Sequence, residues 1–284
     1  MLKYKLFTIY IFLQTALCGC QQDKNRADFE IVEDAYEVTQ LAKMDKTEVA
    51  ESSGFAWAED GSTLWTHGDG GGLNELYKVD LQGKLLETRT IANTVNADWE
   101  DLTKDKAGNI YIGDFGNNNN KRRNLRIFKV NLNDSVKVDT IQFRYADQDL
   151  FPPDKKDRNF DSEAFFWHNN NLYLFTKDRG REELVKVYKV SDKPGNYVAE
   201  VVDSLQINTM ITAADISPDG KHFALLGYGK VYLFEMPSGD KIFDGKKICI
   251  PVGKSGQAEA LVFENNNDLI FSNENGKIFR VKKK

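Results

Sequence analysis

Acidic side chains recur at the starts of similar segments in this sequence, and carboxylates gathered in one place can hold a cation. In NADWEDLTKDKAGNIYIGDFGNN (residues 96–118), Glu100 and Asp101 stand directly before a short apolar run. Oxygen ligands without His or Cys suit calcium far better than zinc. We therefore expect Ca²⁺ as a cofactor if these acids converge. The expected metal ligands are Glu51, Glu100, Glu163, Asp215 and Glu259.

Five segments share one internal pattern, which indicates a repeat protein. Each has a small or acidic start, an apolar run, a turn rich in Asn, Asp or Gly, a second run with aromatic residues, another turn and a third run. The starts recur at intervals of roughly 45 to 63 residues, as in propeller blades of about four strands. The segments begin at Glu51, Trp99, Ser162, Ala213 and Ala258.

The repeats predict an all-β chain folded as a single β-propeller, with five blades favoured and six as the alternative. The fifth repeat reaches the C-terminus after three strands, so it lacks an outer one. The segment FEIVEDAYEVTQL (residues 29–41) is expected to supply that strand and close the ring, which removes an exposed sheet edge. A sixth blade would need residues 28–50 and the connection at 147–159.

This fold brings the acids at the repeat starts towards the central channel, because inner strands of a propeller begin near its axis. Converging carboxylates repel one another and are partly desolvated, so they must take up protons, accept hydrogen bonds or share a cation. A structural alternative stays open for each acid. It would then cap backbone N–H groups of the next blade and do nothing more.

A second group of residues follows the second strand of several repeats, on one face of the disc. LWTHGDGGG (residues 64–72) places His67 close to Asp69, and IYIGDFGNN (residues 110–118) contains Asp114. These three are the candidate catalytic residues. The alternative is that such loops are hairpin turns chosen for their backbone conformation. The candidate ligand-binding residues on this face are Asp178, Arg179, Arg122 and Arg123.

The first residues read as a lipoprotein export signal. Lys3 and Lys5 precede an apolar stretch too short to span a bilayer, and Leu17 to Cys20 resembles a lipobox whose cysteine is acylated. We predict a signal peptide over residues 1–19, a structureless polar tether over 20–29 and the propeller over 30–284. The protein would then lie in the cell envelope, on the outer membrane with a periplasmic or surface-facing position. Its N-terminal lipid would be its only contact with the membrane.

The amino-acid composition limits the kinds of partner that we expect the protein to bind. A net charge of -5 leaves no electrostatic footprint for nucleic acid, and we expect a monomer that binds a polar or anionic ligand or a surface partner. With Cys20 acylated and Cys249 in an apolar strand, no disulfide is expected. The sequence also contains no G-x-S-x-G, H-E-x-x-H or P-loop motif.

Residues 51–120 resemble the opening blades of a group of bacterial secreted and lipid-anchored propeller proteins. ESSGFAW, LWTHGDGG, NADWEDL and YIGDFGNN carry this resemblance. The same motifs are more loosely similar to esterase-like, phytase-type propellers. The layout of five blades with acids at inner-strand starts is distantly similar to calcium-activated apyrases, which implies a central calcium ion.

Two functions are consistent with these observations. The favoured one is a lipid-anchored binding module whose channel cation is structural and whose loop face holds a ligand or partner. The alternative is a metal-dependent hydrolase of phosphate or carboxylate esters, in which calcium on Glu100, Glu163 and Glu259 positions the substrate and Asp114 or His67 activates water. Propellers host both binding and catalysis, so fold does not choose between these functions.

Overall fold

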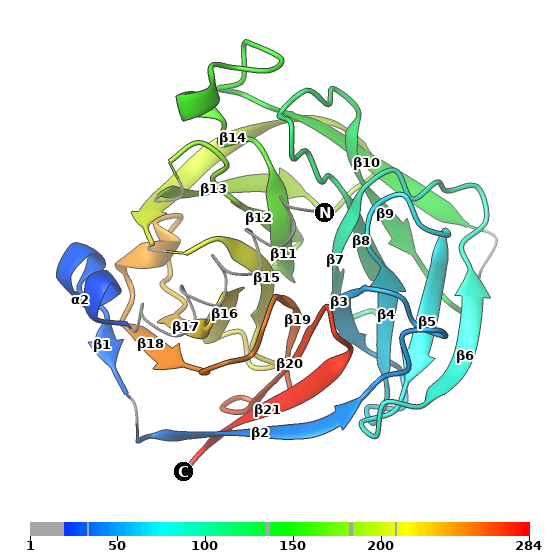
Figure 1. The fold of residues 1–284 in the computed structure, drawn as a ribbon. Coiled ribbons are helices and arrows are strands. Elements are labelled where there is room, and N and C mark those ends of the chain that lie inside the picture. The colour runs from blue at the N-terminus through cyan, green and yellow to red at the C-terminus, as the bar shows by residue number, and fades with distance from the viewer. Residues whose placement is uncertain (1–19, 33, 134–136, 182–183, 208) are drawn as a thin grey trace, which may run out of the picture.

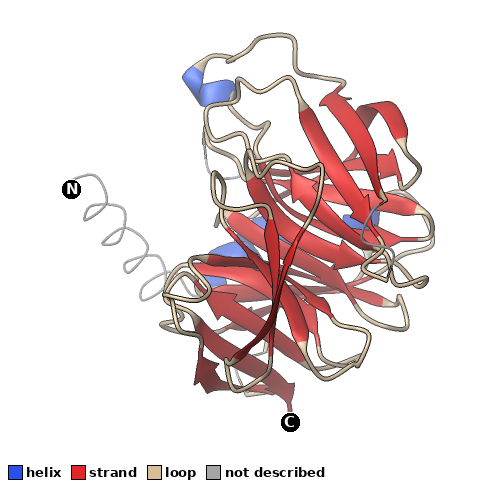
Figure 2. Cartoon of the chain, turned by 90° about the vertical axis from the view of Figure 1, so that its right-hand side faces the viewer, coloured by secondary structure: helices blue, strands red, loops and turns tan. Residues whose placement is uncertain are grey.

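The computed structural model describes residues 20–32, 34–133, 137–181, 184–207 and 209–284. Short antiparallel strands surround a central axis (Figure 1), and helices contribute only short pieces (Figure 2). The prediction of an all-β propeller is confirmed. Residues 1–19, predicted as the signal peptide, lie outside the described residues. Among the described residues, no helix has the length and apolar character needed to cross a membrane.

Five four-stranded units follow one another along the chain, each running from an inner strand outwards. The first two units contain β3 (Ser52–Trp57), β4 (Leu64–Gly68), β5 (Glu75–Val79) and β6 (Leu85–Thr90), then β7 (Trp99–Lys104), β8 (Ile110–Asp114), β9 (Leu125–Val130) and β10 (Val138–Tyr145). The third contains β11 (Ser162–His168), β12 (Asn171–Thr176), β13 (Leu184–Ser191) and β14 (Gly195–Gln206).

The last two units are completed by segments from the other end of the chain. The fourth contains β15 (Ile211–Ile216), β16 (His222–Gly227), β17 (Lys230–Glu235) and β18 (Lys247–Pro251), and the fifth contains β19 (Ala258–Phe263), β20 (Leu269–Asn273), β21 (Lys277–Lys283) and β2 (Tyr36–Lys43). Strand β1 (Glu30–Ile31) adds to β18 in parallel. Two 3₁₀ turns, Lys155–Asp157 and Ile242–Asp244, lie in connections.

The ring closes where the N-terminal strand β2 pairs antiparallel with the C-terminal strand β21, as the sequence predicts (Figure 1). The pairing removes the open edge that a three-stranded last unit would expose. Two units also share their outer edges, because β10 and β14 pair in parallel from Ile141 with Gly195 to Tyr145 with Ala199. Four hydrogen-bonded sheets therefore contain five units, since the second and third units merge into one eight-stranded sheet.

The hydrophobic core consists of five clusters, each lying between two neighbouring units. Trp65 and Ile112 belong to the cluster between the first and second units, for example, and Phe55 and Ile270 to the cluster between the fifth and first. The innermost strands β3, β7, β11, β15 and β19 contact one another in the same cyclic order. The apolar side chains thus hold the units together as a closed ring, and the polar side chains of the inner strands are left facing the channel.

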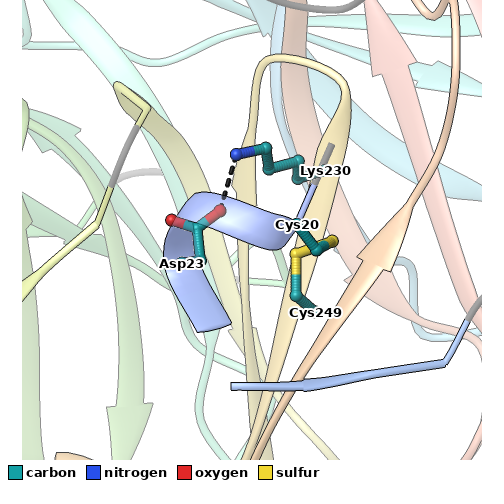
Figure 3. The surroundings of a disulfide bond; sticks show 4 residues. All are labelled: Cys20, Asp23, Lys230 and Cys249. Carbon is teal, nitrogen blue, oxygen red and sulfur yellow. Dashed lines mark hydrogen bonds and ion pairs between the residues drawn. A yellow bond between two sulfur atoms is a disulfide. The ribbon is translucent and has the colours of Figure 1, made fainter. Parts of the chain in front are cut away.

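The segment after the predicted signal peptide is ordered against the outside of the fourth unit, contrary to the expected structureless tether. Helix α2 (Gln21–Ala27) lies beside β18, and the buried carboxylate of Asp23 is 2.6 Å from the ammonium of Lys230 (Figure 3). Cys20 forms a disulfide with Cys249 across a sequence separation of 229 residues. Cys249 is a buried strand residue as predicted, but the expectation that no disulfide forms is wrong.

This disulfide bears directly on the predicted lipid anchor. The lipid of a bacterial lipoprotein is attached through the sulfur of the cysteine, and the Cys20 sulfur is bonded here to Cys249. One sulfur cannot carry both bonds. Acylation of Cys20 is therefore an alternative to the disulfide and stays a prediction.

Candidate ligand-binding site in the central channel

Each inner strand contains one β-bulge near its start, and the bulges occupy equivalent positions in the five units. A bulge leaves an extra residue unpaired and re-aims its side chain. The residues inside the register shifts are Gly54 and Phe55, Glu100 and Asp101, Glu163, Thr212, and Glu259. Three of the five units thus place a glutamate at the bulge, and these glutamates converge on the channel.

The bulge glutamates line a cavity of about 200 Å³ at one mouth of the channel, which we call the acidic pocket. Loops that follow the second strand of each unit supply most of the remaining wall. The acidic residues that line the pocket are Glu51, Asp69, Asp98, Glu100, Glu163, Glu259 and Glu274. Its cationic residues are Lys177 and Arg179. The structure brings the four glutamates at repeat starts, Asp69 and Arg179 to this pocket, and the metal, catalytic and ligand-binding roles expected of them stay predictions.

A buried ion network organises one side of the acidic pocket. The Lys177 ammonium and the Arg179 guanidinium both donate to the carboxylate of Glu163. Arg179 also donates through Nε to Asp161 Oδ2 at 2.5 Å, and the other oxygen of Asp161 accepts from the Asn117 N–H at 2.5 Å. Burial alone would lower the pKa of Lys177, but Glu163 beside it raises that pKa above its ordinary value. Lys177 is thus a resident cation of the pocket.

Two other carboxylates of the acidic pocket lack such partners. Within the described chain, no hydrogen bond or ion pair reaches the carboxylates of Glu100, which is buried, and Glu259, which is half-buried. Burial, reinforced by Glu163, raises the pKa of Glu100 well above its ordinary value. Burial also raises the pKa of Glu259 to about 8, against the opposing effect of Lys177. These carboxyls therefore lack a partner in the described chain that would favour their charged form.

Two lining acids were not among the sequence candidates. A Cβ on Gly116 would lie 2.6 Å from Cγ of Asp98, so the Asp98 carboxylate packs closely against a loop backbone that only glycine permits. Burial, followed by repulsion from Asp161, raises the pKa of Asp98 to about 6. Glu274 follows β20 as Lys177 follows β12, and this shared position was a usable signal in the sequence. Burial and Glu51 raise the pKa of Glu274 to about 7.

Asp215 is not brought to the acidic pocket. The bulge position of the fourth unit is Thr212, whose hydroxyl donates to the Ala258 carbonyl, and Asp215 lies three residues further along β15. Its Oδ2 accepts from the N–H of Phe263 in the next unit at 2.8 Å. Asp101 acts similarly, because its Oδ2 accepts from the N–H groups of Phe165 and Ala214. Both aspartates take the structural role of caps between units.

The three candidate catalytic residues do not come together. His67 is fully buried, its Nδ1 lies 2.8 Å from the Gly68 carbonyl, and its buried Nε2 has no partner among the described residues. Burial lowers the pKa of His67 to about 4, so the ring is neutral at pH 7. Asp114 is buried between Arg122 at 3.0 Å and Arg126 at 2.7 Å. Only Asp69 lines the acidic pocket.

The four residues predicted to bind a ligand also divide into one that lines the acidic pocket and three that do not. Arg122 lies behind the pocket wall, 4.0 Å from Asp98 and held by Asp114 and the Gly116 carbonyl. Arg123 lies with its guanidinium 3.7 Å from the ring centroid of Phe151, outside the pocket lining. Asp178 accepts backbone N–H groups of its own turn, which agrees with the turn alternative. Arg179 alone of the four lines the acidic pocket.

A metal centre is not pre-assembled in this arrangement. Across the part of the chain that the structure describes, no group of three His, Cys, Asp or Glu side chains is placed to hold a metal ion. The donor chemistry is that of a calcium site, since every acidic group in the pocket offers carboxylate oxygen. Glu163 is engaged by two cations, so Glu100 and Glu259, which have no such partner in the described chain, are the acids that remain open to Ca²⁺.

The fold and the pocket define a class of protein, a closed β-propeller with an acidic cavity at one mouth of its channel. The chain belongs to the SdiA-regulated family, whose model matches residues 28–223. No curated protein matches the chain. Together with the closed ring of strands, the family match supports the predicted β-propeller family, and the resemblances to lipid-anchored and phytase-type proteins stay predictions.

Solved structures are similar in fold at low sequence identity. The gluconolactonase of Xanthomonas campestris has a TM-score of 0.53 at 13% identity, with 93% of each chain covered. A putative gluconolactonase has a TM-score of 0.53 at 12% identity, covering 91% of this chain and 97% of that one. The PQQ-bound aldose sugar dehydrogenase of Streptomyces coelicolor has a TM-score of 0.51 at 9% identity, covering 89% and 100%. At these identities the likeness concerns the fold alone.

Proposed function

We propose that the protein is a ligand-binding propeller whose acidic pocket takes a polar ligand with a positively charged group. Seven carboxylate residues line the pocket against two cationic ones. The sequence predicts a polar or anionic ligand or a surface partner. The charge balance of the pocket favours a ligand with a cationic group, because a cation in a partly desolvated acidic cavity relieves repulsion among the carboxylates.

The observation that carries this proposal is the placement of Glu100 and Glu259 by equivalent bulges, without a hydrogen-bond partner in the described chain. Buried polar groups normally have partners, and a site that leaves two carboxylates open is arranged for something that is not part of the chain. Glu163 shows the paired alternative, since Lys177 and Arg179 already neutralise it.

Binding of cationic probes tests this function. We would titrate the full chain with glucosamine, glucose and CaCl₂ by calorimetry. Glucosamine is expected to bind and glucose is not, because the two differ by the ammonium group. Glu100→Gln and Glu259→Gln should each weaken glucosamine binding about tenfold, roughly the 1.4 kcal/mol of one charge interaction. Glu200→Gln, an exposed carboxylate on the outer strand β14, is the matched control. Equal binding of both sugars, or unchanged affinity in the two variants, would refute the proposal.

Binding of Ca²⁺ in the acidic pocket is a specific form of the same proposal. Ca²⁺ would be held by Glu100 and Glu259 and would supply a positive charge for a ligand on the loop face. Calcium that binds only the folded chain must raise the melting temperature, and a chelator must reverse the rise. If glucosamine binds but Ca²⁺ leaves the melting temperature unchanged, the pocket recognises organic cations and the metal proposal is withdrawn.

Hydrolysis of carboxylate esters is the second candidate. The observation that favours it is a set of acids at the cavity with pKa values raised towards neutrality, such as Asp98 at about 6 and Glu274 at about 7, which suits general acid or base catalysis. The gluconolactonases of similar fold act on a cyclic ester, as their name says. A screen of lactones and aryl esters with the wild-type chain and Asp98→Asn tests this function. Turnover that Asp98→Asn does not reduce would exclude Asp98 from catalysis.

We also propose that the protein acts in the cell envelope, as the N-terminal sequence predicts. Membrane fractionation together with the intact mass of the purified chain tests whether Cys20 is acylated or bonded to Cys249. A mass increased by acyl chains, with the protein in the membrane fraction, supports the lipid anchor. An unacylated protein with Cys20 bonded to Cys249 would refute the anchor.

A further inference from the structure

The three most exposed large apolar side chains of the described chain all lie on the face that bears the acidic pocket. Leu73 is 64% exposed, Val95 64% and Leu150 63%. Each lies in a loop that follows the second strand of a unit or precedes the next inner strand, as the pocket loops do. The other exposed large apolar residues among those described lie on the outer strands β6 and β14. Exposed apolar surface next to polar groups is typical of interaction sites.

Two of these side chains belong to the loops that supply pocket acids. Leu73 lies in the loop with Asp69, and Val95 lies in the loop with Asp98. The side chain of Asn96 joins the two loops, because its Nδ2 lies 3.2 Å from the Asp69 carbonyl and 3.5 Å from the Leu73 carbonyl. Val95 precedes Asp98 by three residues, which span at most about 11 Å. We call Leu73 and Val95 the apolar rim of the acidic pocket.

The stretch between the apolar rim and the pocket contains only glycine. Gly70 to Gly72 separate Asp69 from Leu73, and all three glycines are exposed. A Cβ on Gly70 would lie 2.1 Å from Asp98 Oδ1, so the loop packs on this pocket acid because the residue is glycine. A Cβ on Gly71 would have no atom within 4 Å. Another chain can therefore approach the backbone of this loop closely.

The size of the acidic pocket limits what enters it. Its volume of about 200 Å³ is below the range of about 300–1,000 Å³ for small-molecule sites. The pocket therefore suits one head group, and the rest of the ligand lies outside, where the apolar rim is. The head group that suits Glu100 and Glu259 is a cation, because neither carboxylate has a partner in the described chain. A lysine or arginine side chain carries such a head group on a long apolar stem.

We infer that the ligand of the acidic pocket is a polypeptide segment that places a lysine or arginine head group in the pocket and a neighbouring apolar side chain on the apolar rim. Adjacent residues of a peptide carry these two groups within the span of about 11 Å that separates Asp98 from Val95. Arginine is enriched among residues that anchor protein interfaces, and contacts around such an anchor exclude water. The inference rests on the proposed function, because it names the kind of molecule that carries the cationic group.

Calorimetric titration of the full chain with three probes tests the inference. The probes are acetyl-Leu-Lys-Leu-amide, acetyl-lysinamide, which lacks the apolar neighbours, and acetyl-Leu-Gln-Leu-amide, which lacks the cation. We expect the lysine tripeptide to bind about tenfold more tightly than acetyl-lysinamide, and the glutamine tripeptide not to bind at the same concentrations. If acetyl-lysinamide and glucosamine bind but the lysine tripeptide binds no more tightly, the inference is overturned and the proposed function stands. If no cationic probe binds, both are overturned.

Variants then locate the apolar contact. Leu73→Ser and Val95→Ser, at exposed loop positions, should each weaken binding of the lysine tripeptide about threefold and leave acetyl-lysinamide binding unchanged. Glu100→Gln should weaken binding of both cationic probes. Leu86→Ser, at a position 48% exposed on the outer strand β6 of the same unit, is the matched control and should bind both normally. Unchanged affinity of the tripeptide for both rim variants would overturn the inference.

Two other occupants of the apolar rim give different results. Phenethylamine that binds as tightly as the lysine tripeptide would identify a small amphipathic amine as the ligand and overturn the inference. Sedimentation of the free chain tests for a second copy of the protein. A dimer that Leu73→Ser dissociates would place that copy on the apolar rim and would also overturn the inference.

Discussion

The ammonium of Lys177 and the carboxylate of Glu163 form an ion pair in which each side chain is 5% exposed. Glu163 is a bulge residue of β11, and Lys177 follows the end of β12 in the same unit. The pair lies at the side of the acidic pocket, where it provides one of only two positive charges among the lining residues. Its removal should therefore change both stability and cation binding.

We expect Lys177→Met to lower the free energy of unfolding at pH 7 by about 3 kcal/mol, because breaking a buried pair leaves an uncompensated charge. Arg179 remains on Glu163 and keeps the loss at the lower end of the usual range. Urea denaturation measures this loss in the free energy of unfolding. Lys189→Met, which breaks an exposed pair with Asp240, is the control and should cost under about 1 kcal/mol. Similar losses in the two variants would contradict the role given to Lys177.

The raised pKa values in the acidic pocket predict how stability depends on pH. A carboxyl with a folded pKa above its unfolded pKa keeps its proton longer in the folded state, so its contribution to stability is lost as pH rises through the folded pKa. Glu259 at about 8 and Glu274 at about 7 act in this direction. His67, with its pKa lowered to about 4, has the opposite effect between about pH 4 and 6.5 and none above.

The melting temperature should therefore fall between about pH 6.5 and 8.5, by roughly 2–4 °C for each kcal/mol lost. Calorimetric scans across this range measure the fall. Glu259→Gln removes one titrating group and should flatten the slope, whereas Glu200→Gln should not. A melting temperature that stays level from pH 6.5 to 8.5 in the wild type would show that the pocket acids are ionised throughout.

Much of the architecture could be predicted because the repeats give the same evidence for a unit several times. Five copies of one pattern indicate the units, and a last repeat with only three strands requires an outer strand such as β2. The positions of single side chains follow from hydrogen-bond register, which periodicity does not reveal. Glu163 and Thr212 are the bulge residues of β11 and β15, so Asp215, three residues after Thr212, does not share the place of Glu163 although both are acids near the start of a repeat.

Contacts between distant parts of the chain were also beyond the sequence. Asp114 resembles a free acid at the end of a strand, but Arg122 from the following loop and Arg126 from β9 neutralise it. The polar composition of residues 21–28 favours a tether, whereas helix α2 packs on distant parts of the chain, with Asp23 paired to Lys230 and the preceding Cys20 bonded to Cys249 of β18. Both features depend on tertiary contacts, which the local sequence pattern does not show.

The disulfide between Cys20 and Cys249 makes a prediction for stability. Cross-linking positions so far apart restricts the unfolded chain, and its loss typically costs 2–5 kcal/mol. We expect reductant, Cys20→Ser and Cys249→Ser to lower the melting temperature of the full chain by similar amounts, since each removes the same bond. The double variant should lose no more than either single one. If reductant and Cys249→Ser leave the melting temperature unchanged, Cys20 is not bonded to Cys249 in the purified protein.

The cap formed by Asp101 gives a prediction for the junction of three units. Its carboxylate accepts the N–H of Leu102 on its own strand and the N–H groups of Phe165 and Ala214 on the next two inner strands. Asp101→Ala leaves these buried donors without an acceptor, at about 1–3 kcal/mol for each, so we expect a loss of several kcal/mol or failure to fold. Asp101→Asn keeps one acceptor oxygen, which can serve Phe165 and Ala214, and should lose only about 1–3 kcal/mol. Glu100→Gln, one residue away but facing the pocket, should cost less than either variant. If Asp101→Ala unfolded at the same urea concentration as Glu100→Gln, the carboxylate would not be what joins the three strands.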